Sequence, residues 1–291
     1  MAKAVHCSVI IPAFNEEAVI SRCLSNLLDG APSDHGMEII VAANGCHDAT
    51  VEIAKAVAPQ SRILDLAKGT KTGAINAANA IASRFPRIYL DADVECSYST
   101  IMALCNAFEE SEVMTAAPAI RLNLDRASWL IRAYFRVWQK QPYARSGNGG
   151  AGCYALSCAA SEHVGDFPDI IGDDIWIHTR FPEDQKRYVS SDGEGSPVFT
   201  VVYPPRTALE QIRVEARRQI GNAEVLRLHP GPHDLRSGGA GAVRTAFQSG
   251  SSPLDIATFF SMKFCARLLA KWNRSRGRGS VWSRDHSSRQ V

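Results

Sequence analysis

Ile88-Tyr89-Leu90-Asp91-Ala92-Asp93 is the stretch of this sequence that decides the fold and its chemistry. An apolar run that ends in two carboxylates one residue apart is typical of a buried strand that reaches the edge of a sheet. Side chains alternate along a strand, so Asp91 and Asp93 are expected on the same side. Two such acids repel each other unless a positive group lies between them, and a hard divalent cation, Mg²⁺ or Mn²⁺, prefers carboxylate oxygen. The alternative is a pair of solvated loop acids after a strand.

The overall composition is that of a globular protein with a buried core. The chain has 291 residues, of which 45% are hydrophobic, and its formal net charge is +2. This charge neither favours nor excludes nucleic acid, and no nucleic-acid partner is expected. The eight cysteines form no CxxC pair, so we expect reduced thiols in a cytoplasmic protein. No apolar run approaches the ~20 residues of a membrane-spanning helix, and Pro12 follows the start too closely for a signal peptide.

Short apolar segments alternate with amphipathic ones along the N-terminal third of the chain. The segments 7–11, 38–42, 62–66 and 88–90 are predicted strands, and the segments 17–29, 49–57 and 74–84 between them are predicted helices. Strands that alternate with helices indicate an α/β fold with a mainly parallel sheet. Ligands of such sheets bind beyond the carboxyl ends of the strands.

A polar loop follows each of the predicted strands. The residues of these loops that carry polar side chains are Asn15, Glu16, Glu17, Asn44, Asp48, Lys71, Asp91 and Asp93. They are expected to converge on one rim of the sheet, and a rim with carboxylates, a lysine and glycine-containing loops suits a nucleoside diphosphate. The first strand is not followed by GxGxxG, and the sequence has no P-loop lysine with its glycines, so neither of these nucleotide sites is expected.

Four segments in this order resemble the motifs of family 2 glycosyltransferases, which have the GT-A fold of the nucleotide-diphospho-sugar transferase superfamily. They are Val9–Glu17, Ala43–Thr50, Lys71–Asn76 and Asp91–Asp93. The resemblance implies a Rossmann-like, mainly parallel central sheet flanked by helices, with a C-terminal helical extension. In the second segment, Ala43-Asn44 stands where much of the family has an Asp-Asp pair. An amide can still pair with a nucleobase edge, because it both donates and accepts hydrogen bonds.

The resemblance also implies roles for individual residues. Asp93 would bind a divalent metal, Mg²⁺ or Mn²⁺, with the help of Asp91. The residues that would bind the nucleotide-sugar are Pro12, Ala13, Asn15, Glu17, Asn44, Lys71 and Asp91. Asp173-Asp174 lies where the family has its Glu-Asp acceptor motif, so Asp174 would be the catalytic general base, with Asp173 as the alternative. Without the resemblance, the same two acids are interpreted as caps or dipole partners at a helix start.

The implied reaction is the transfer of a sugar, of hexosyl type, from a nucleotide-diphospho-sugar to an acceptor hydroxyl, with inversion at the anomeric carbon. The acceptor is expected in cell-envelope, polysaccharide or glycolipid synthesis, and it could be lipid-linked. Two other functions stay open: a sugar-phosphate nucleotidyltransferase, and a non-catalytic nucleotide-sugar-binding protein of the same fold. The nucleotidyltransferase would normally carry a glycine-rich basic loop after the first strand, whereas residues 12–17 are acidic.

The chain is expected to contain one glycosyltransferase domain at 1–229. Its first half, 1–118, would bind the nucleotide-sugar, and its second half, 119–229, would bind the acceptor. The remaining segments are a Gly-, Ser- and Pro-rich linker at 230–253, an amphipathic basic helix at 254–275 and a flexible basic tail at 276–291.

Two basic helices leave alternatives open. The helix that Thr207 caps carries Gln211, Arg213, Arg217 and Arg218, which loosely resemble a later Gln/Arg-containing helix of the family. Its arginines either neutralise the charge of a leaving diphosphate or form a solvated basic face. Residues 254–278 either contact a membrane surface or fold back on the domain. The membrane alternative would place the protein peripherally on the inner face of the membrane.

Overall fold

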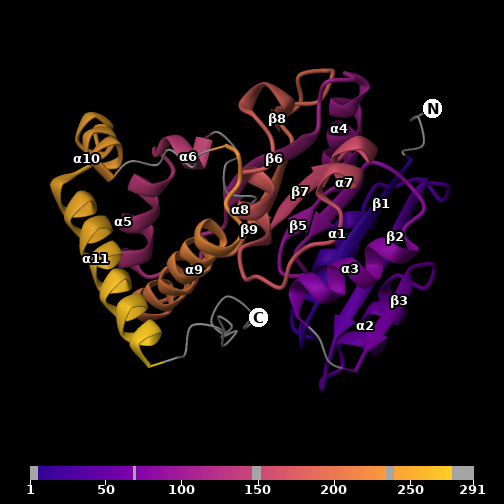
Figure 1. The fold of residues 1–291 in the computed structure, drawn as a ribbon, viewed down its shortest axis with the longest axis horizontal. Helices are drawn as coiled ribbons and strands as arrows, with labels where there is room; N and C mark the ends of the chain where they lie inside the picture. Colours follow the sequence, from indigo (N-terminus) through magenta and orange to yellow (C-terminus); the bar gives the residue numbers. More distant parts are fainter. Residues whose placement is uncertain (1–5, 68–69, 146–151, 234–238, 277–291) are drawn as a thin grey trace.

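The computed structural model describes residues 6–67, 70–145, 152–233 and 239–276, and a nine-stranded sheet runs through these ranges (Figure 1). The strand order is β3-β2-β1-β4-β7-β6-β9-β5, and β8 pairs with β6. The strands are β1 Cys7–Ala13, β2 Met37–Asn44, β3 Arg62–Leu66, β4 Arg87–Leu90, β5 Glu95–Cys96, β6 Thr115–Leu122, β7 Cys153–Leu156, β8 Lys186–Val189 and β9 Phe199–Val202. Strands β3, β2, β1 and β4 are parallel, whereas β7 runs antiparallel to β4 and β6. The mainly parallel α/β sheet predicted from the sequence is confirmed.

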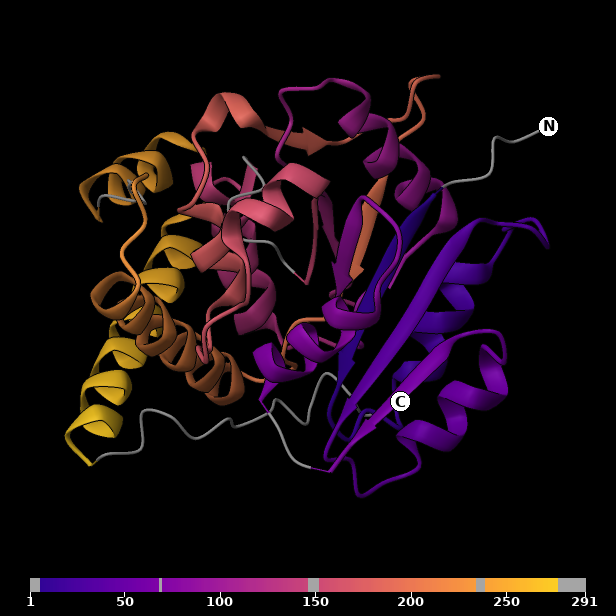
Figure 2. The same ribbon diagram turned by 45° about the vertical axis from the view of Figure 1, so that its right-hand side comes forward.

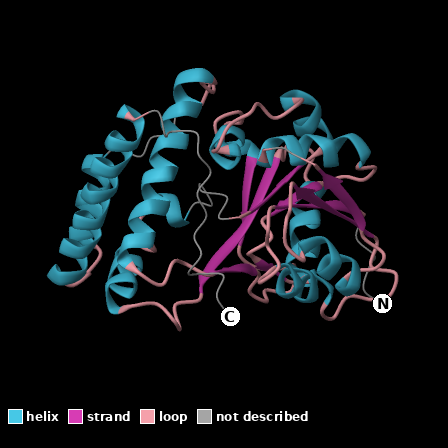
Figure 3. Cartoon of the chain, turned by 90° about the horizontal axis from the view of Figure 1, so that it is seen from below, coloured by secondary structure: helices cyan, strands magenta, loops and turns pink. Residues whose placement is uncertain are grey.

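Helices cover the sheet and form a further layer beside it, which Figure 3 shows as the group of long helices apart from the strands. The helices are α1 Ile20–Leu28, α2 Thr50–Val57, α3 Lys71–Ile81, α4 Tyr98–Asn106, α5 Trp129–Trp138, α6 Pro142–Arg145, α7 Cys158–Val164, α8 Asp173–His178, α9 Ala208–Leu228, α10 Gly239–Gln248 and α11 Pro253–Ser275. Short 3₁₀ turns lie at Ala107–Glu109 and Glu183–Gln185.

Strand β1 shows why the sequences of the first strands are apolar at nearly every position. Val9 and Ile11 are buried in a cluster that contains Leu24 of α1, whereas Ile10 is buried in a second cluster that contains Ile75 of α3. Successive side chains of a strand point to opposite faces, so helices on both faces require apolar residues at every position. The core therefore has two parts, one on each face of the parallel strands.

Strand β4 ends at Leu90, and the two acids after it lie in a turn. The backbone N–H of Val94 donates a hydrogen bond to the carbonyl of Asp91, at 3.1 Å. The expectation that strand alternation places Asp91 and Asp93 on one side does not apply, because β4 ends at Leu90 and a turn begins at Asp91. Tertiary contacts, described below, bring the two carboxylates to one cavity.

Helices α5, α9 and α11 form the further layer, and it has an apolar core of its own. Tyr134 of α5 and Phe259 of α11 lie in one cluster, and Ala216 of α9 packs near Ala266 of α11 in another. Within the described ranges, no helix is both long enough and apolar enough to cross a bilayer.

The segment 230–253 was expected to be a linker. This expectation was wrong for residues 239–248, which form helix α10. Its small residues include Ala246, which is buried in the same cluster as Tyr134, so packing stabilises a helix that the glycines disfavour. The predicted helix at 254–275 is present as α11, and the predicted tail lies outside the described residues from 277 onward.

A buried carboxylate, Glu215 of α9, holds this helical layer together. Lys263 of α11 donates to its Oε1 at 2.6 Å, Arg218 donates to its Oε2 at 2.8 Å, and the hydroxyl of Tyr134 lies 3.5 Å from the same Oε2. Burial acts to raise the pKa of Glu215, but the charges of Arg218 and Lys263 outweigh it and hold the pKa at about 2. Glu215 therefore stays ionised near neutral pH and links α9 to α11.

We expect Glu215→Gln to lower the free energy of unfolding by about 3–5 kcal/mol at pH 7, because it removes the buried carboxylate that pairs with both Lys263 and Arg218. The pKa of Glu215 in the folded protein lies below its ordinary value of 4.5. Its ionic contribution is therefore complete above that value and is lost as the pH falls toward 2. Urea unfolding of both proteins should show a difference that shrinks over this range, and a constant difference would contradict the assignment. The double variant Glu215→Leu/Lys263→Met should recover much of the loss.

Candidate active site

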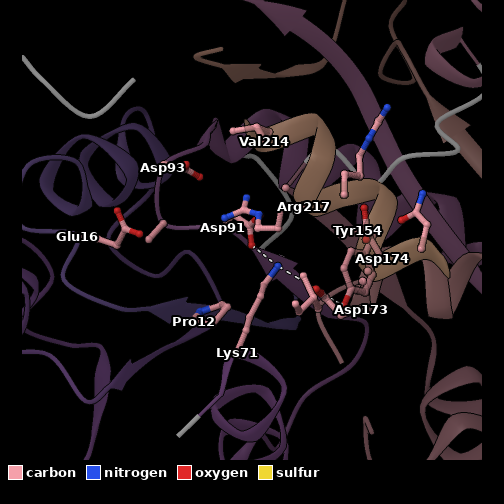
Figure 4. A pocket seen from close by; sticks show the side chains of 17 residues that line it. Pro12, Glu16, Lys71, Asp91, Asp93, Tyr154, Asp173, Asp174, Val214 and Arg217 are labelled. Atoms are coloured by element: carbon pink, nitrogen blue, oxygen red, sulfur yellow. Dashed lines mark hydrogen bonds and ion pairs between the residues drawn. The ribbon is translucent and has the colours of Figure 1, made fainter. Parts of the chain in front are cut away.

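The first turn of α3 places a lysine between two acid pairs. Thr70 caps the helix by accepting a hydrogen bond from the N–H of Gly73 at 3.2 Å. The Nζ of Lys71 then lies 2.7 Å from Asp91 Oδ1 and 3.1 Å from Asp173 Oδ1 (Figure 4). Burial acts to lower the pKa of Lys71, but the charges of Asp173 and Asp91 outweigh it and raise the pKa. Lys71 therefore joins the acids that follow β4 to the acids that begin α8.

The two carboxylates at the start of α8 have different surroundings. Asp173 is buried, and its Oδ2 accepts a hydrogen bond from the hydroxyl of Tyr154 at 3.0 Å, while its Oδ1 faces Lys71. Both oxygens of Asp173 are thus engaged. Burial, and then the charge of Asp173, raise the pKa of Asp174 to about 6 against the opposing charge of Lys71. Asp174 is therefore suited to exchange a proton near neutral pH.

Gly152, directly before β7, fixes the backbone of Asp91. Its carbonyl accepts a hydrogen bond from the N–H of Asp91 at 2.8 Å. Its φ of +78° lies in the left-handed region, and a Cβ at this position would stand 2.5 Å from Val94 Cγ2 and 3.2 Å from the Cβ of Asp91. Both the conformation and the space require glycine here.

A cavity of about 250 Å³ lies between these acids and α9. The α9 residues that line it are Val214, Arg217, Arg218, Gly221 and Asn222. Their spacing of three and four residues places them on one face of the helix. Figure 4 shows Arg217 beside Asp91. Of the two alternatives for Arg217 and Arg218, the structure supports a position in the site over a purely solvated basic face.

The structure brings together six of the predicted site residues and leaves four outside the lining of the cavity. Those that line it are Pro12, Lys71, Asp91, Asp93, Asp173 and Asp174, and those that do not are Ala13, Asn15, Glu17 and Asn44. Glu16, expected at this rim but given no role of its own, also lines it, and so does Tyr154, which was not predicted. The signal for Glu16 was its place in the acidic loop after β1. Tyr154 carried no local signal, since its role depends on the pairing of β7 with β4.

Asn15 and Glu17 hold the loop after β2 against the loop after β1. Asn15 Oδ1 accepts a hydrogen bond from the N–H of His47 at 2.7 Å, and Glu17 Oε2 accepts one from the N–H of Ala49 at 3.1 Å. Asn15 has a φ of 50°, a conformation that asparagine adopts more readily than most residues. The observed contacts of these two side chains are thus between loops.

Asn44 ends β2 and is buried, yet its Oδ1 has no hydrogen-bond partner among the described residues. A buried polar atom without a partner costs about 1–3 kcal/mol. Ala13 ends the neighbouring strand β1, where it pairs with Ala43. The ends of β1 and β2 therefore present a buried acceptor that a ligand N–H could satisfy.

The acids of the turn after β4 fit a divalent metal that binds together with a substrate. No group of three or more His, Cys, Asp or Glu in the described part of the chain could hold a metal ion alone. Asp91 and Asp93 nevertheless line the same cavity. In phosphate-transfer sites Mg²⁺ usually takes one or two protein carboxylates and completes its shell with water and phosphate oxygens. Two carboxylates beside a cavity are sufficient for that arrangement.

Comparisons with known proteins agree on the fold. The sequence model described as glycosyl transferase family 2 matches residues 8–165. A mannosyltransferase from Pyrobaculum calidifontis, solved with GDP-Man and Mn²⁺, has a TM-score of 0.64 and 18% identity, and the match covers 94% of this chain and 89% of that chain. A glucosyl-3-phosphoglycerate synthase from Mycobacterium tuberculosis, solved with Mn²⁺, UDP and glucosyl-3-phosphoglycerate, has a TM-score of 0.55 and 18% identity, with 76% and 79% covered. No curated protein matches the sequence.

We expect Gly152→Ala to destabilise the protein more than Gly165→Ala. The second variant is the control, because it changes the backbone preference without a close contact. Gly165 also has a positive φ, of 63°, but a Cβ there would meet nothing within 4 Å. The control should cost about 1–3 kcal/mol for its backbone conformation, with φ 63° and ψ −142°, and Gly152→Ala at least about 1 kcal/mol more for the clash. Urea unfolding measures both variants. Equal losses would show that the close approach of Gly152 to Asp91 and Val94 is unimportant.

Proposed function

The chain belongs to glycosyl transferase family 2, and on this premise we propose that it transfers a sugar from a nucleotide-diphospho-sugar to an acceptor hydroxyl with inversion at the anomeric carbon. Its α/β architecture is of the GT-A type, with a mainly parallel sheet and a C-terminal helical region. The observation that carries the proposal is the position of Lys71, 2.7 Å from Asp91 and 3.1 Å from Asp173. The acids proposed for the donor and for the acceptor therefore face one cavity.

We assign the general base to Asp174. It would take the proton of the attacking hydroxyl as that oxygen bonds to the anomeric carbon and the bond to the diphosphate oxygen breaks. A pKa of about 6 leaves Asp174 largely ionised at pH 7 and basic enough to accept the proton. Asp173 would act by positioning, because Lys71 and Tyr154 already engage both of its oxygens. Inversion by single displacement requires the base and the leaving group on opposite sides of the sugar.

The donor diphosphate is proposed to lie between the turn after β4 and α9. Lys71 and Arg217 would supply positive charge to it from the two sides of the cavity. Asp93, with Asp91, would hold a divalent metal, Mg²⁺ or Mn²⁺, which when bound offsets the charge that develops on the leaving group. The presence of GDP-Man and Mn²⁺ in the mannosyltransferase from Pyrobaculum calidifontis supports this assignment.

The nucleoside is proposed to lie at the ends of β1 and β2. The buried amide oxygen of Asn44, which has no partner in the described chain, fits an N–H on the edge of a nucleobase. Pro12 and Ala13 would contact the nucleoside through the end of β1. Asn15 and Glu17 would shape this subsite by holding the second loop in place.

The wider setting is also part of the proposal. The transferred group is a hexose and the acceptor belongs to cell-envelope, polysaccharide or glycolipid synthesis, with a lipid-linked acceptor included. Structures of the glucosyl-3-phosphoglycerate synthase with UDP-glucose, and of the mannosyltransferase with GDP-Man, support a hexose donor. The enzyme would act in the cytoplasm, peripherally on the inner face of the membrane, through residues 254–278.

Thermal unfolding measured with a series of nucleotide-sugars should identify the donor and test the metal site. With Mn²⁺ present, the correct donor should raise Tm by about 5 °C at roughly 100 times Kd, and other nucleotide-sugars by much less. Asp93→Asn should abolish the Mn²⁺-dependent part of the shift. No response to any nucleotide-sugar would contradict donor binding, and pyrophosphate release from a sugar phosphate and a nucleoside triphosphate would instead support a nucleotidyltransferase.

The dependence of transfer on pH should report the ionisation of Asp174. Because the base must be deprotonated, kcat/KM should fall about tenfold per pH unit below pH 6. Asp174→Asn should reduce kcat by about 10²–10⁴-fold. Asp173→Asn should retain transfer and move the acid limb to lower pH, because it removes the like charge that raises the pKa of Asp174. If Asp174→Asn retains turnover and Asp173→Asn loses it, Asp173 is the general base and Asp174 the positioning residue.

A further inference from the structure

The side of α11 that is turned away from its neighbours carries a row of large apolar side chains. Phe264, Leu268 and Trp272 are 60%, 54% and 54% exposed. They recur at every fourth residue, so they lie along one face of the helix. Large apolar residues exposed singly are ordinary, but a contiguous row on one helix marks an interaction surface.

This surface lies on the outside of the helical layer. Figures 1 and 2 show α11 at the edge of the molecule, with α10 beside its N-terminal end. The opposite face of α11 packs on α9 through Ala266 and Ala270, and another face of α9 lines the cavity. Helix α9 therefore separates the outer face of α11 from the proposed active site. Further exposed apolar residues of this region are Val243, Phe247 and Leu254.

Basic residues border the apolar row. Arg267, Lys271 and Arg274 are exposed on α11. Asp255 is the single acid in the sequences of α10 and α11, and it is buried in an ion pair with Arg136 at 2.6 Å. The exposed side of α11 thus combines apolar and positively charged groups without a negative one. Such a helix lies well in the interface of a bilayer, where acidic headgroups attract its cations.

We propose that the outer face of α11, formed by Phe264, Leu268, Trp272, Arg267, Lys271 and Arg274, binds the surface of an anionic lipid bilayer. The helix would lie in the plane of the membrane, with the apolar row among the acyl chains and the cations at the headgroups. A second copy of the chain fits less well, because a symmetric contact would bring like charges together. The inference rests on the proposed function, in which an acceptor of an envelope or glycolipid pathway is reached at a membrane.

Co-sedimentation of the full chain with vesicles tests this proposal. Binding should be strong to phosphatidylcholine mixed with phosphatidylglycerol, weak to phosphatidylcholine alone, and reduced by high salt. Serine at Phe264, Leu268 and Trp272 together should lower the partition coefficient at least about tenfold. Glutamine at Arg267, Lys271 and Arg274 should remove the preference for the anionic lipid. Each charge removed should lower the partition coefficient about fivefold.

The matched control replaces three exposed apolar residues elsewhere, Trp129, Leu209 and Leu226, by serine. This control should bind vesicles as the unaltered chain does. Equal losses in both triple variants, or no loss in the α11 variant, would overturn the proposal. A dimer in solution that the α11 variant dissociates, with no vesicle binding, would assign the face to a second copy.

Thermal stabilisation by Mn²⁺ and a nucleotide, measured on the same variants, separates this proposal from the proposed function. Because α9 lies between the two sites, the α11 variant should keep that stabilisation while it loses vesicle binding. Vesicle binding without any nucleotide response would support the membrane surface and overturn the proposed transfer from a nucleotide-sugar. Loss of both in the α11 variant would indicate misfolding, which circular dichroism would show, and the charge variant would then decide the question.

Discussion

The contact of Lys71 with Asp91 and Asp173 is the interaction on which the rest of the site depends. A partly buried lysine is costly unless carboxylates accompany it, and the buried Asp173 is costly without the lysine. The three residues begin α3, follow β4 and begin α8, so their charges bring together segments that are far apart in the chain. This pairing defines the centre of the cavity and leaves Asp174 as the acid with a pKa near neutrality.

The parallel strands supply the frame for that contact. Apolar side chains cover both faces of β1, β2 and β4, so these strands are held rigidly and their carboxyl ends lie together. The loops beyond them are then joined to each other by side chains such as Asn15 and Glu17. Gly152 allows β7 to approach Asp91 closely enough for a backbone hydrogen bond. The rigid sheet and these close contacts together set the position of each carboxylate.

Helices α9 and α11 give the helical layer two different surfaces. One face of α9 forms a wall of the cavity, and its other side packs on α11 through small residues and the buried Glu215. Glu215 also contacts Arg218, which lines the cavity, so the ion pair that joins the two helices reaches the site. The outer face of α11 contacts neither α9 nor the cavity, and it is the face proposed to bind the bilayer. One pair of helices thus lies between the proposed chemistry and the proposed membrane contact.

The sequence by itself determined the order of strands and helices and the loops that carry polar residues, because period and turn residues are properties of neighbours in the chain. It also determined most of the acids of the cavity, since residues after parallel strands must lie at one edge of the sheet. Only the tertiary structure decided that Asp91 and Asp93 lie in a turn, that Tyr154 holds Asp173, and that Arg217 faces the cavity. The positions of Tyr154 and Arg217 depend on contacts between distant segments, whereas a local hydrogen bond from Val94 to Asp91 closes the turn. For the same reason α10 was not predicted, because its glycines disfavour a helix locally and its burial against the helical layer stabilises one.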